Sequence, residues 1–330
     1  MHKPILVAGI PRTGSSWFAE ILAKADNAIY LHEPDNEKLN FSAWNLKKNL
    51  HRYPYLRKDR KSADYLKLWE EIFSNGKTRF YNNEAEAFQL EPHYVEYQIG
   101  KKCKLVHETF FKNNCGGRFT TPFFISRLKE LLRVAIYQDT FRQRKRTDKR
   151  LIIKSVHCIL ALEWLCHNFD IDIVVIVRRP ANIIASCLEL KLPDSMRNIF
   201  SQRQLIEDYF KHIDPDRLTT QSIIQAMAVQ IGAFYYILEQ QQKNYDWIIV
   251  KHEDMCTDTQ IMCKTVFDKL GLSWNKGVEK HIARHDDQGS GFNTFRLAES
   301  LPDKYRLSFS PGEIEEIKKY YGMFNNRLYD

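Results

Sequence analysis

Residues 5–17 read Ile-Leu-Val-Ala-Gly-Ile-Pro-Arg-Thr-Gly-Ser-Ser-Trp, and this stretch decides the fold. Its first six residues form a short apolar run, typical of a buried β-strand. Gly9 and Gly14 have the spacing of a phosphate-binding loop. Beyond the loop, apolar residues recur at helical spacing, so a helix is expected from about Ser16. A strand, a glycine turn and a helix N-terminus together predict a site where backbone N–H groups bind an anion.

The loop departs from the common P-loop at one position. Ser15 stands where the pattern GxxxxGK[ST] places a lysine. The cation lies earlier in the loop, at Arg12. A kinase of this architecture also needs an acidic residue near a strand end to hold Mg²⁺, but the strongest apolar run, 171–177, ends in Arg178 and Arg179. The pattern favours an anionic ligand that needs no metal.

Further strand-like runs alternate with helical patterns along the chain. The expected strands are 5–10, 28–32, 104–107, 151–154, 171–177 and 247–250. Nearly unbroken apolar strands between helices predict an α/β fold with a central, mostly parallel sheet flanked by helices. Because ligands bind at the carboxyl ends of such strands, we expect one shared crevice. Its expected members are Arg12, Glu33, Lys154 and Arg178.

We interpret 1–330 as a single domain in which 35–100 and 200–243, the latter largely helical, are insertions that build an acceptor site. Helices are also expected at three further places. One carries Cys158, Ala161, Leu162 and Leu165 on one face, one begins at Pro180, and the last begins at Ser310, with Glu313 completing a capping box.

The composition limits the function classes. Of 330 residues 44% are hydrophobic, and no apolar run is long enough to span a membrane. Seven scattered cysteines without CxxC spacing argue against disulfides and a thiolate zinc site. No secretory signal is evident, so a cytoplasmic location is expected. The net charge of +8 indicates an anionic partner. We expect no nucleic acid, since no such motif is present, and we leave peripheral membrane contact open.

Two distant motifs resemble those of one family. Pro11-Arg-Thr-Gly-Ser-Ser-Trp17 resembles the 5′-phosphosulfate loop of sulfotransferases that use 3′-phosphoadenosine 5′-phosphosulfate (PAPS). Val177-Arg-Arg-Pro-Ala-Asn-Ile-Ile-Ala-Ser186 resembles their 3′-phosphate motif, an arginine followed eight residues later by a serine. Leu31-His-Glu-Pro34 and the arginine at position 12 are similar to the carbohydrate branch of the family, whereas the cytosolic enzymes carry lysine in the loop.

The resemblance implies a role for each matching residue. The loop residues Arg12, Thr13, Gly14, Ser15, Ser16 and Trp17 would hold the 5′-phosphosulfate. Arg178 and Ser186 would bind the 3′-phosphate, with Arg179 as an alternative to Arg178. The donor would be PAPS, the product 3′,5′-adenosine bisphosphate (PAP), and no metal is expected.

An acceptor hydroxyl needs a base. Glu33 is the first candidate and His157 the second, while Lys154 would neutralise the leaving phosphate. His32 alternates to the other side of its strand and is not expected in the same cleft. The preferred acceptor is a carbohydrate, either a glycan or a lipid-linked sugar, ahead of a lipid or small natural product. A P-loop nucleotide kinase and a non-catalytic nucleotide- or polyanion-binding module remain alternatives.

Overall fold

The computed structural model describes residues 2–37, 41–74, 150–213, 218–285 and 302–329. These residues fall into two compact units. One comprises 1–33, 49–63 and 148–330, and the other comprises 34–48 and 64–147. The expected strand 104–107 lies outside the described residues, and the assignment of 1–330 to one domain with insertions at 35–100 and 200–243 stays a prediction.

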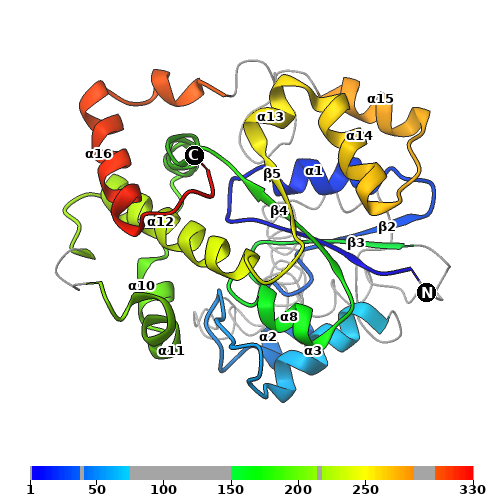
Figure 1. The fold of residues 1–330 in the computed structure, drawn as a ribbon, viewed down its shortest axis with the longest axis horizontal. Helices are drawn as coiled ribbons and strands as arrows, with labels where there is room; N and C mark the ends of the chain where they lie inside the picture. Colours follow the sequence, from blue (N-terminus) through cyan, green and yellow to red (C-terminus); the bar gives the residue numbers. More distant parts are fainter. Residues whose placement is uncertain (1, 38–40, 75–149, 214–217, 286–301, 330) are drawn as a thin grey trace, which may run out of the picture. The chain divides into compact units, whose positions relative to one another are not determined.

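A five-stranded, all-parallel sheet forms the centre of the first unit (Figure 1). The strands are β1 (Ile5–Ala8), β2 (Ala28–His32), β3 (Arg150–Ser155), β4 (Asp172–Val177) and β5 (Ile248–Lys251). Their order is β2-β3-β1-β4-β5. β1, β3 and β4 are nearly or fully buried along their length, as expected of parallel strands that are covered on both faces. The structure therefore confirms the α/β class and five of the expected strands.

The two helical connections between strands run in opposite directions across the sheet. The chain passes through α1 (Ser15–Leu22) to β2 on one side, and after β3 through α8 (Leu162–Asn168) to β4 on the other. Right-handed crossovers then place the two helices on opposite faces of the sheet, as Figure 1 shows. The strand order reverses at β1, so the carboxyl ends of β3, β1 and β4 border the crevice where such sheets bind ligands.

Further helices complete the first unit. They are α9 (Pro180–Glu189), α10 (Met196–Phe200), α11 (Arg203–Leu205), a π-helical turn (Ile206–Phe210), α12 (Ile223–Gln242), α13 (His252–Thr257), α14 (Thr259–Leu270), α15 (Lys276–His285) and α16 (Pro311–Tyr321), with 3₁₀ turns at Lys304–Leu307 and Gly322–Phe324. α1 packs against α14 and α15, and α12 packs against α9 and α16. The expected helical character of 200–243 and the helix from Pro180 are confirmed.

The capping box of α16 is also confirmed, because the Ser310 side chain accepts from the Glu313 N–H while the Glu313 carboxylate accepts from Ser310. The helix expected to include Cys158 is wrong at its start. The Ser155 hydroxyl accepts the N–H groups of His157 and Cys158 at 3.0 and 3.4 Å, which holds the chain in a turn until α8 begins at Leu162.

The second unit contains α2 (Phe41–Leu46) and most of α3 (Ala63–Ser74). In it, the buried Lys47 ammonium donates to the Asp35 carbonyl at 2.8 Å and to the Glu37 carboxylate at 3.1 Å. Tyr65 and Trp69 are fully buried and meet edge to face.

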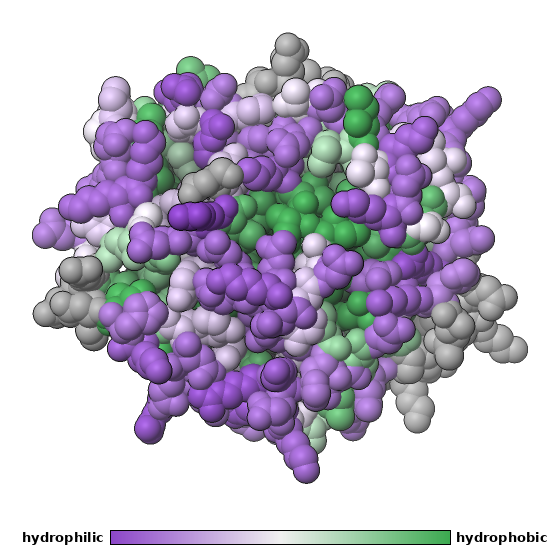
Figure 2. Space-filling view, viewed as in Figure 1, coloured by the Kyte–Doolittle hydropathy of each residue, from purple (hydrophilic) through white to green (hydrophobic). Residues whose placement is uncertain are grey.

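No helix within the described ranges is long and apolar enough to cross a membrane. Figure 2 shows one face of the molecule, on which hydrophobic side chains gather near the middle, in the region of β5 and α1.

Candidate active site

The phosphate-binding loop joins β1 to α1 through two left-handed residues. Gly14 has φ +89° and forms the N-cap of α1, and Arg12 has φ +74°. The Thr13 side chain is fully buried, and its hydroxyl donates to the Ile10 carbonyl at 2.9 Å. Only glycine adopts such a φ without strain, so Gly14 is suited to its place. Arg12 lacks that freedom, and strain at a non-glycine residue is characteristic of functional loops.

The start of α1 presents unsatisfied donors. The first bond of the helix runs from the Phe18 N–H to the Gly14 carbonyl at 3.1 Å. The N–H groups of Ser15, Ser16 and Trp17 precede it and belong to the set that a helix cannot satisfy internally. No acidic residue occupies the first turn of α1. The helix end is therefore electropositive and suited to an anion.

A buried histidine lies directly against the loop. A Cβ at Gly14 would collide with the ring of His252, the first residue of α13. The His252 ring centroid lies 6.0 Å from that of Trp17, and its Nδ1 lies 3.5 Å from the Cys256 sulfur. Burial and the charge of Arg178 lower the pKa of His252 well below its usual value. A neutral imidazole therefore forms the wall behind Gly14.

The two motifs that resemble the 5′ and 3′ sites meet in the structure. The Arg12 guanidinium donates from Nε to the Ser186 hydroxyl at 2.9 Å, across 174 residues. Arg178 donates from a terminal nitrogen to the Arg12 carbonyl at 2.9 Å. The predicted ligands of two phosphate groups are thus linked by hydrogen bonds. The alternative residue Arg179 instead donates to the Pro302 carbonyl and to Asp303.

Arg178 is a buried arginine. It directly follows β4 in the chain and is 7% exposed. The Tyr235 hydroxyl accepts the Arg178 N–H at 2.8 Å and donates to the Arg178 carbonyl at 2.7 Å. Burial lowers the pKa of the guanidinium from its usual value. Its Nε has no hydrogen-bond partner among the described residues. A buried, charged N–H without a partner is costly, so this atom marks a place for an anion.

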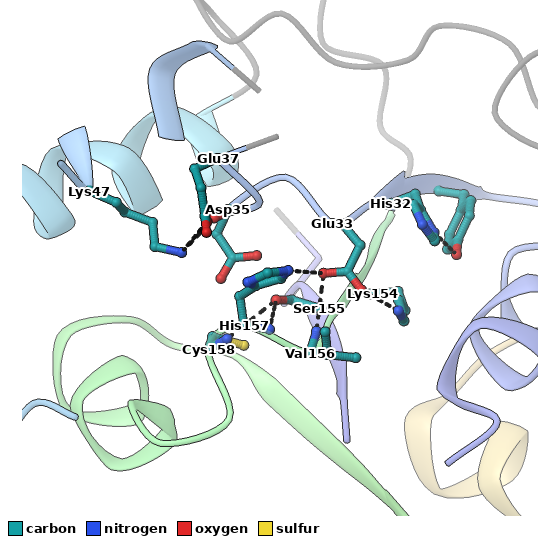
Figure 3. A network of polar contacts seen from close by, with 11 residues as sticks. His32, Glu33, Asp35, Glu37, Lys47, Lys154, Ser155, Val156, His157 and Cys158 are labelled. Atoms are coloured by element: carbon teal, nitrogen blue, oxygen red, sulfur yellow. Dashed lines mark hydrogen bonds and ion pairs between the residues drawn. The ribbon is translucent and has the colours of Figure 1, made fainter. Parts of the chain in front are cut away.

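Glu33 forms the second cluster, at the carboxyl ends of β2 and β3 (Figure 3). Its carboxylate accepts a hydrogen bond at Oε1 from the Lys154 ammonium and one at Oε2 from the Val156 N–H, the latter at 3.2 Å. The His157 Nε2 lies 3.8 Å from Oε2, the carboxylate oxygen that also accepts the Val156 N–H. Glu33 itself has φ +46°. Lys154 pairs with Val7 of β1 in the sheet register, so the strand that begins the loop runs beside this cluster.

The ion pair sets the protonation of the cluster. Burial alone would raise the pKa of Glu33, but attraction to Lys154 and His157 outweighs it and lowers the pKa to about 2. Burial and the charge of Lys154 lower the pKa of His32 to about 4. His32 bonds the Tyr30 hydroxyl at 3.0 Å and points away from Glu33 in Figure 3, as strand alternation predicted. The His157 ring stacks on Tyr53 with centroids 5.6 Å apart.

A cavity of about 430 Å³ opens beside the loop. One wall is the Trp17 ring, and further lining residues are Thr257, Asp258, Gln260, Ile261 and Ile282. An indole beside hydroxyl, carboxylate and amide groups offers a stacking surface with polar partners at its rim. The sequence placed Trp17 among the donor-binding residues, but it gave no sign that residues 257–261 and 282–283 line this cavity.

Three residues of the site were not predicted. His252 and Glu253 begin α13 after the carboxyl end of β5, and Asn182 lies in the first turns of α9. Position could have indicated two of them, since His252 and Glu253 directly follow a strand in a sheet whose strand ends carry the candidate site. Within the described residues, no group of three or more histidine, cysteine, aspartate or glutamate side chains is arranged to hold a metal ion.

A family model described as "Sulfotransferase family" matches residues 4–276. No curated protein matches significantly. Among solved structures, the sulfotransferase domain from the curacin biosynthetic pathway is 13% identical, with 97% of each chain covered and a TM-score of 0.46. A mouse sulfotransferase complexed with PAP is 10% identical, with 98% of this chain and 84% of that chain covered and a TM-score of 0.42. The match over most of the chain shows that this protein belongs to the sulfotransferase family, whose members use PAPS.

Proposed function

We propose that the chain transfers the sulfuryl group of PAPS to a hydroxyl group of a carbohydrate. The observation that carries the donor assignment is the hydrogen-bonded set of Arg178, Arg12 and Ser186. PAPS carries a 3′-phosphate and a 5′-phosphosulfate, two anionic groups on one nucleoside, which calls for two linked anion sites. The buried Arg178 Nε fits the 3′-phosphate as a ready donor. The N–H groups of Ser15 to Trp17 and the Arg12 side chain would hold the 5′ group.

The cavity beside Trp17 is assigned to the adenine base. It opens next to the residue that ends the phosphate-binding loop, and its polar rim of Thr257, Asp258 and Gln260 suits the ring nitrogens and the amino group. The donor supplies an activated sulfuryl group. Arg12 keeps its proton at any working pH, so it stabilises negative charge on the oxygens around the transferred group.

Glu33 is assigned as the group that accepts the proton of the acceptor hydroxyl. In the structure it is an ionised carboxylate that bonds Lys154 and the Val156 N–H. A carboxylate with a pKa near 2 is a weak base. Attraction of Lys154 to the anionic donor would weaken the ion pair and raise the basicity of Glu33. His157, 3.8 Å from Glu33 Oε2, would orient the carboxylate from its other side.

A carbohydrate acceptor is supported by three features of the chain. Arg12 occupies the loop position where the carbohydrate branch carries arginine, and Glu33-Pro34 follows the second strand as in that branch. The cluster at this sheet edge is ionic and polar, which suits an acceptor rich in hydroxyl groups. The kinase alternative has lost its support, since the family match agrees with the absent loop lysine.

The test is transfer of ³⁵S from labelled PAPS to separated glycan, glycolipid, lipid and small-phenol fractions. We expect label on glycans or lipid-linked sugars, and label confined to lipids or phenols would refute the carbohydrate assignment. Glu33→Gln should abolish transfer while PAP affinity changes less than about 3-fold, since Glu33 is not among the assigned donor ligands. His32→Gln is the matched control, because it alters a neighbouring half-buried side chain bonded to Tyr30. Undiminished transfer by Glu33→Gln would show that the base is another group, with His157 next.

A further inference from the structure

One buried amide joins three segments of the chain around the Arg178–Ser186 helix. Asn182 lies in the first turns of α9 and is 2% exposed. Its Nδ2 donates to the Glu253 carboxylate and to the Pro302 carbonyl, each at 3.0 Å. Its Oδ1 accepts the Tyr305 N–H at 3.1 Å. Both amide hydrogens and the amide oxygen are thus used, which is close to the full capacity of the side chain.

The same Glu253 oxygen also holds the start of the helix. Glu253 Oε1 accepts the N–H of Arg179, the N-cap residue of α9, at 3.0 Å. The preceding residue is Arg178, and the Tyr235 hydroxyl bonds both its backbone N–H and its backbone carbonyl. The turn from β4 into α9 is therefore fixed by side chains from α12 and α13. The Arg178 side chain extends from this turn, so the hydrogen bonds of Glu253 and Tyr235 set the direction of that side chain.

The third segment that Asn182 joins is residues 302–305. The Pro302 carbonyl accepts from both Asn182 and the Arg179 guanidinium, each at 3.0 Å. The Arg179 guanidinium also lies 5.0 Å from the centre of the Tyr305 ring. Residues 302–305 are thus bound to the first turns of α9 through their backbone as well as by a cation–π contact. Asn182 and Arg179 both bond this segment and Glu253, and Asn182 does so with its side chain alone.

We propose that Asn182 is a positioning residue for the 3′-phosphate site, where it sets α9 so that Arg178 and Ser186 meet one phosphate group. The inference rests on the proposed PAPS-binding function. Asn182 touches no donor group itself. It acts by fixing the helix against Glu253 and the segment 302–305, and its loss would leave the buried Tyr305 N–H without this partner. Because Arg178 and Ser186 are assigned to the 3′-phosphate, the effect should be confined to nucleotides that carry this group.

The experiment compares PAP with adenosine 5′-monophosphate (AMP), which lacks the 3′-phosphate, by calorimetry. Asn182→Ala should weaken PAP binding at least about 10-fold, the effect of misaligning one or two charge-assisted hydrogen bonds, and AMP binding less than about 3-fold. Asn182→Asp keeps the side-chain volume but removes both donors and brings a carboxylate toward Glu253. It should show the same selective loss if Asn182→Ala fails to fold.

Gln202→Ala is the matched control. Gln202 is also a buried amide with three hydrogen bonds, to the Tyr55 N–H and to the Tyr53 and Asn198 carbonyls, each at 2.8 Å. This control should lower thermal stability without changing the ratio of PAP to AMP affinity. An unchanged ratio in both Asn182 variants, or equal weakening of PAP and AMP, would overturn the inference. Failure of the wild-type protein to bind PAP would instead overturn the proposed function.

Discussion

Replacing Gly14 by alanine tests how the phosphate-binding loop is built. The residue has φ +89°, and a Cβ there would overlap the ring of His252, which is itself buried. A left-handed conformation costs an L-residue about 1–2 kcal/mol. Overlap with a buried side chain typically adds about 1–3 kcal/mol. We therefore expect Gly14→Ala to lower the free energy of unfolding by about 2–5 kcal/mol.

The change should also reach the donor site. Relief of the overlap has to move either His252 or the loop, and the loop carries the N–H groups at the start of α1. Losing one hydrogen bond to a charged group costs about 1.5–3 kcal/mol, so PAP affinity should fall by about 10-fold or more. The assays are urea unfolding and calorimetric titration with PAP.

Gly271 is the matched control, since it too has a positive φ, of +62°, but no atom lies within 4 Å of a Cβ built there. Gly271→Ala should cost only the backbone strain of about 1–2 kcal/mol and leave PAP binding intact. The double variant Gly14→Ala with His252→Ala removes the overlap, so the two single effects should be non-additive by about 1–3 kcal/mol. Equal unfolding free energies and equal PAP affinities for Gly14→Ala and Gly271→Ala would refute the reasoning.

Two further predictions concern the charged groups. Arg178→Lys keeps the charge but loses the planar fork, so PAP affinity should fall about 10- to 100-fold while AMP affinity barely changes; equal losses for the two nucleotides would contradict the assignment of Arg178 to the 3′-phosphate. Glu33 has a pKa of about 2, below its usual 4.5, so its ionised form stabilises the fold above pH 4.5, and this contribution is lost as the pH falls from 4.5 toward 2. The difference in unfolding free energy between wild type and Glu33→Gln should therefore shrink over that window, and a difference that is constant with pH would show that the Lys154 pair does not hold the charge.

The sheet was predictable because its signals are local. Buried parallel strands are apolar along nearly their whole length, and residues 5–8 and 173–177 match that expectation. The capping box at Ser310 involves residues within one stretch of four, so it too could be predicted from the sequence. The start of α8 could not be predicted. The Ser155 hydroxyl accepts two backbone N–H groups and holds the chain in a turn before the helix, and the spacing of apolar residues does not reveal such a turn.

The site was predictable only as far as strand ends define it. The predicted topology placed Glu33 and Lys154 at one edge of the sheet, but only the structure shows that they form an ion pair. The contacts of Arg12 with Ser186 and of Asn182 with Glu253 join residues 174 and 71 positions apart. No spacing rule connects such pairs. His252 was missed for the same reason, since its role depends on its packing against Gly14.

The central claim is that Arg178, Arg12 and Ser186 form the binding site of a 3′-phosphorylated nucleotide. Calorimetric titration of the wild-type protein with PAP, in the presence of a metal chelator and with AMP as the comparison ligand, tests it most directly. We predict one PAP per chain, bound at least about 10-fold more tightly than AMP, because two sets of charge-assisted hydrogen bonds replace one. No PAP binding, binding only after Mg²⁺ is restored, or equal affinity for PAP and AMP would contradict it.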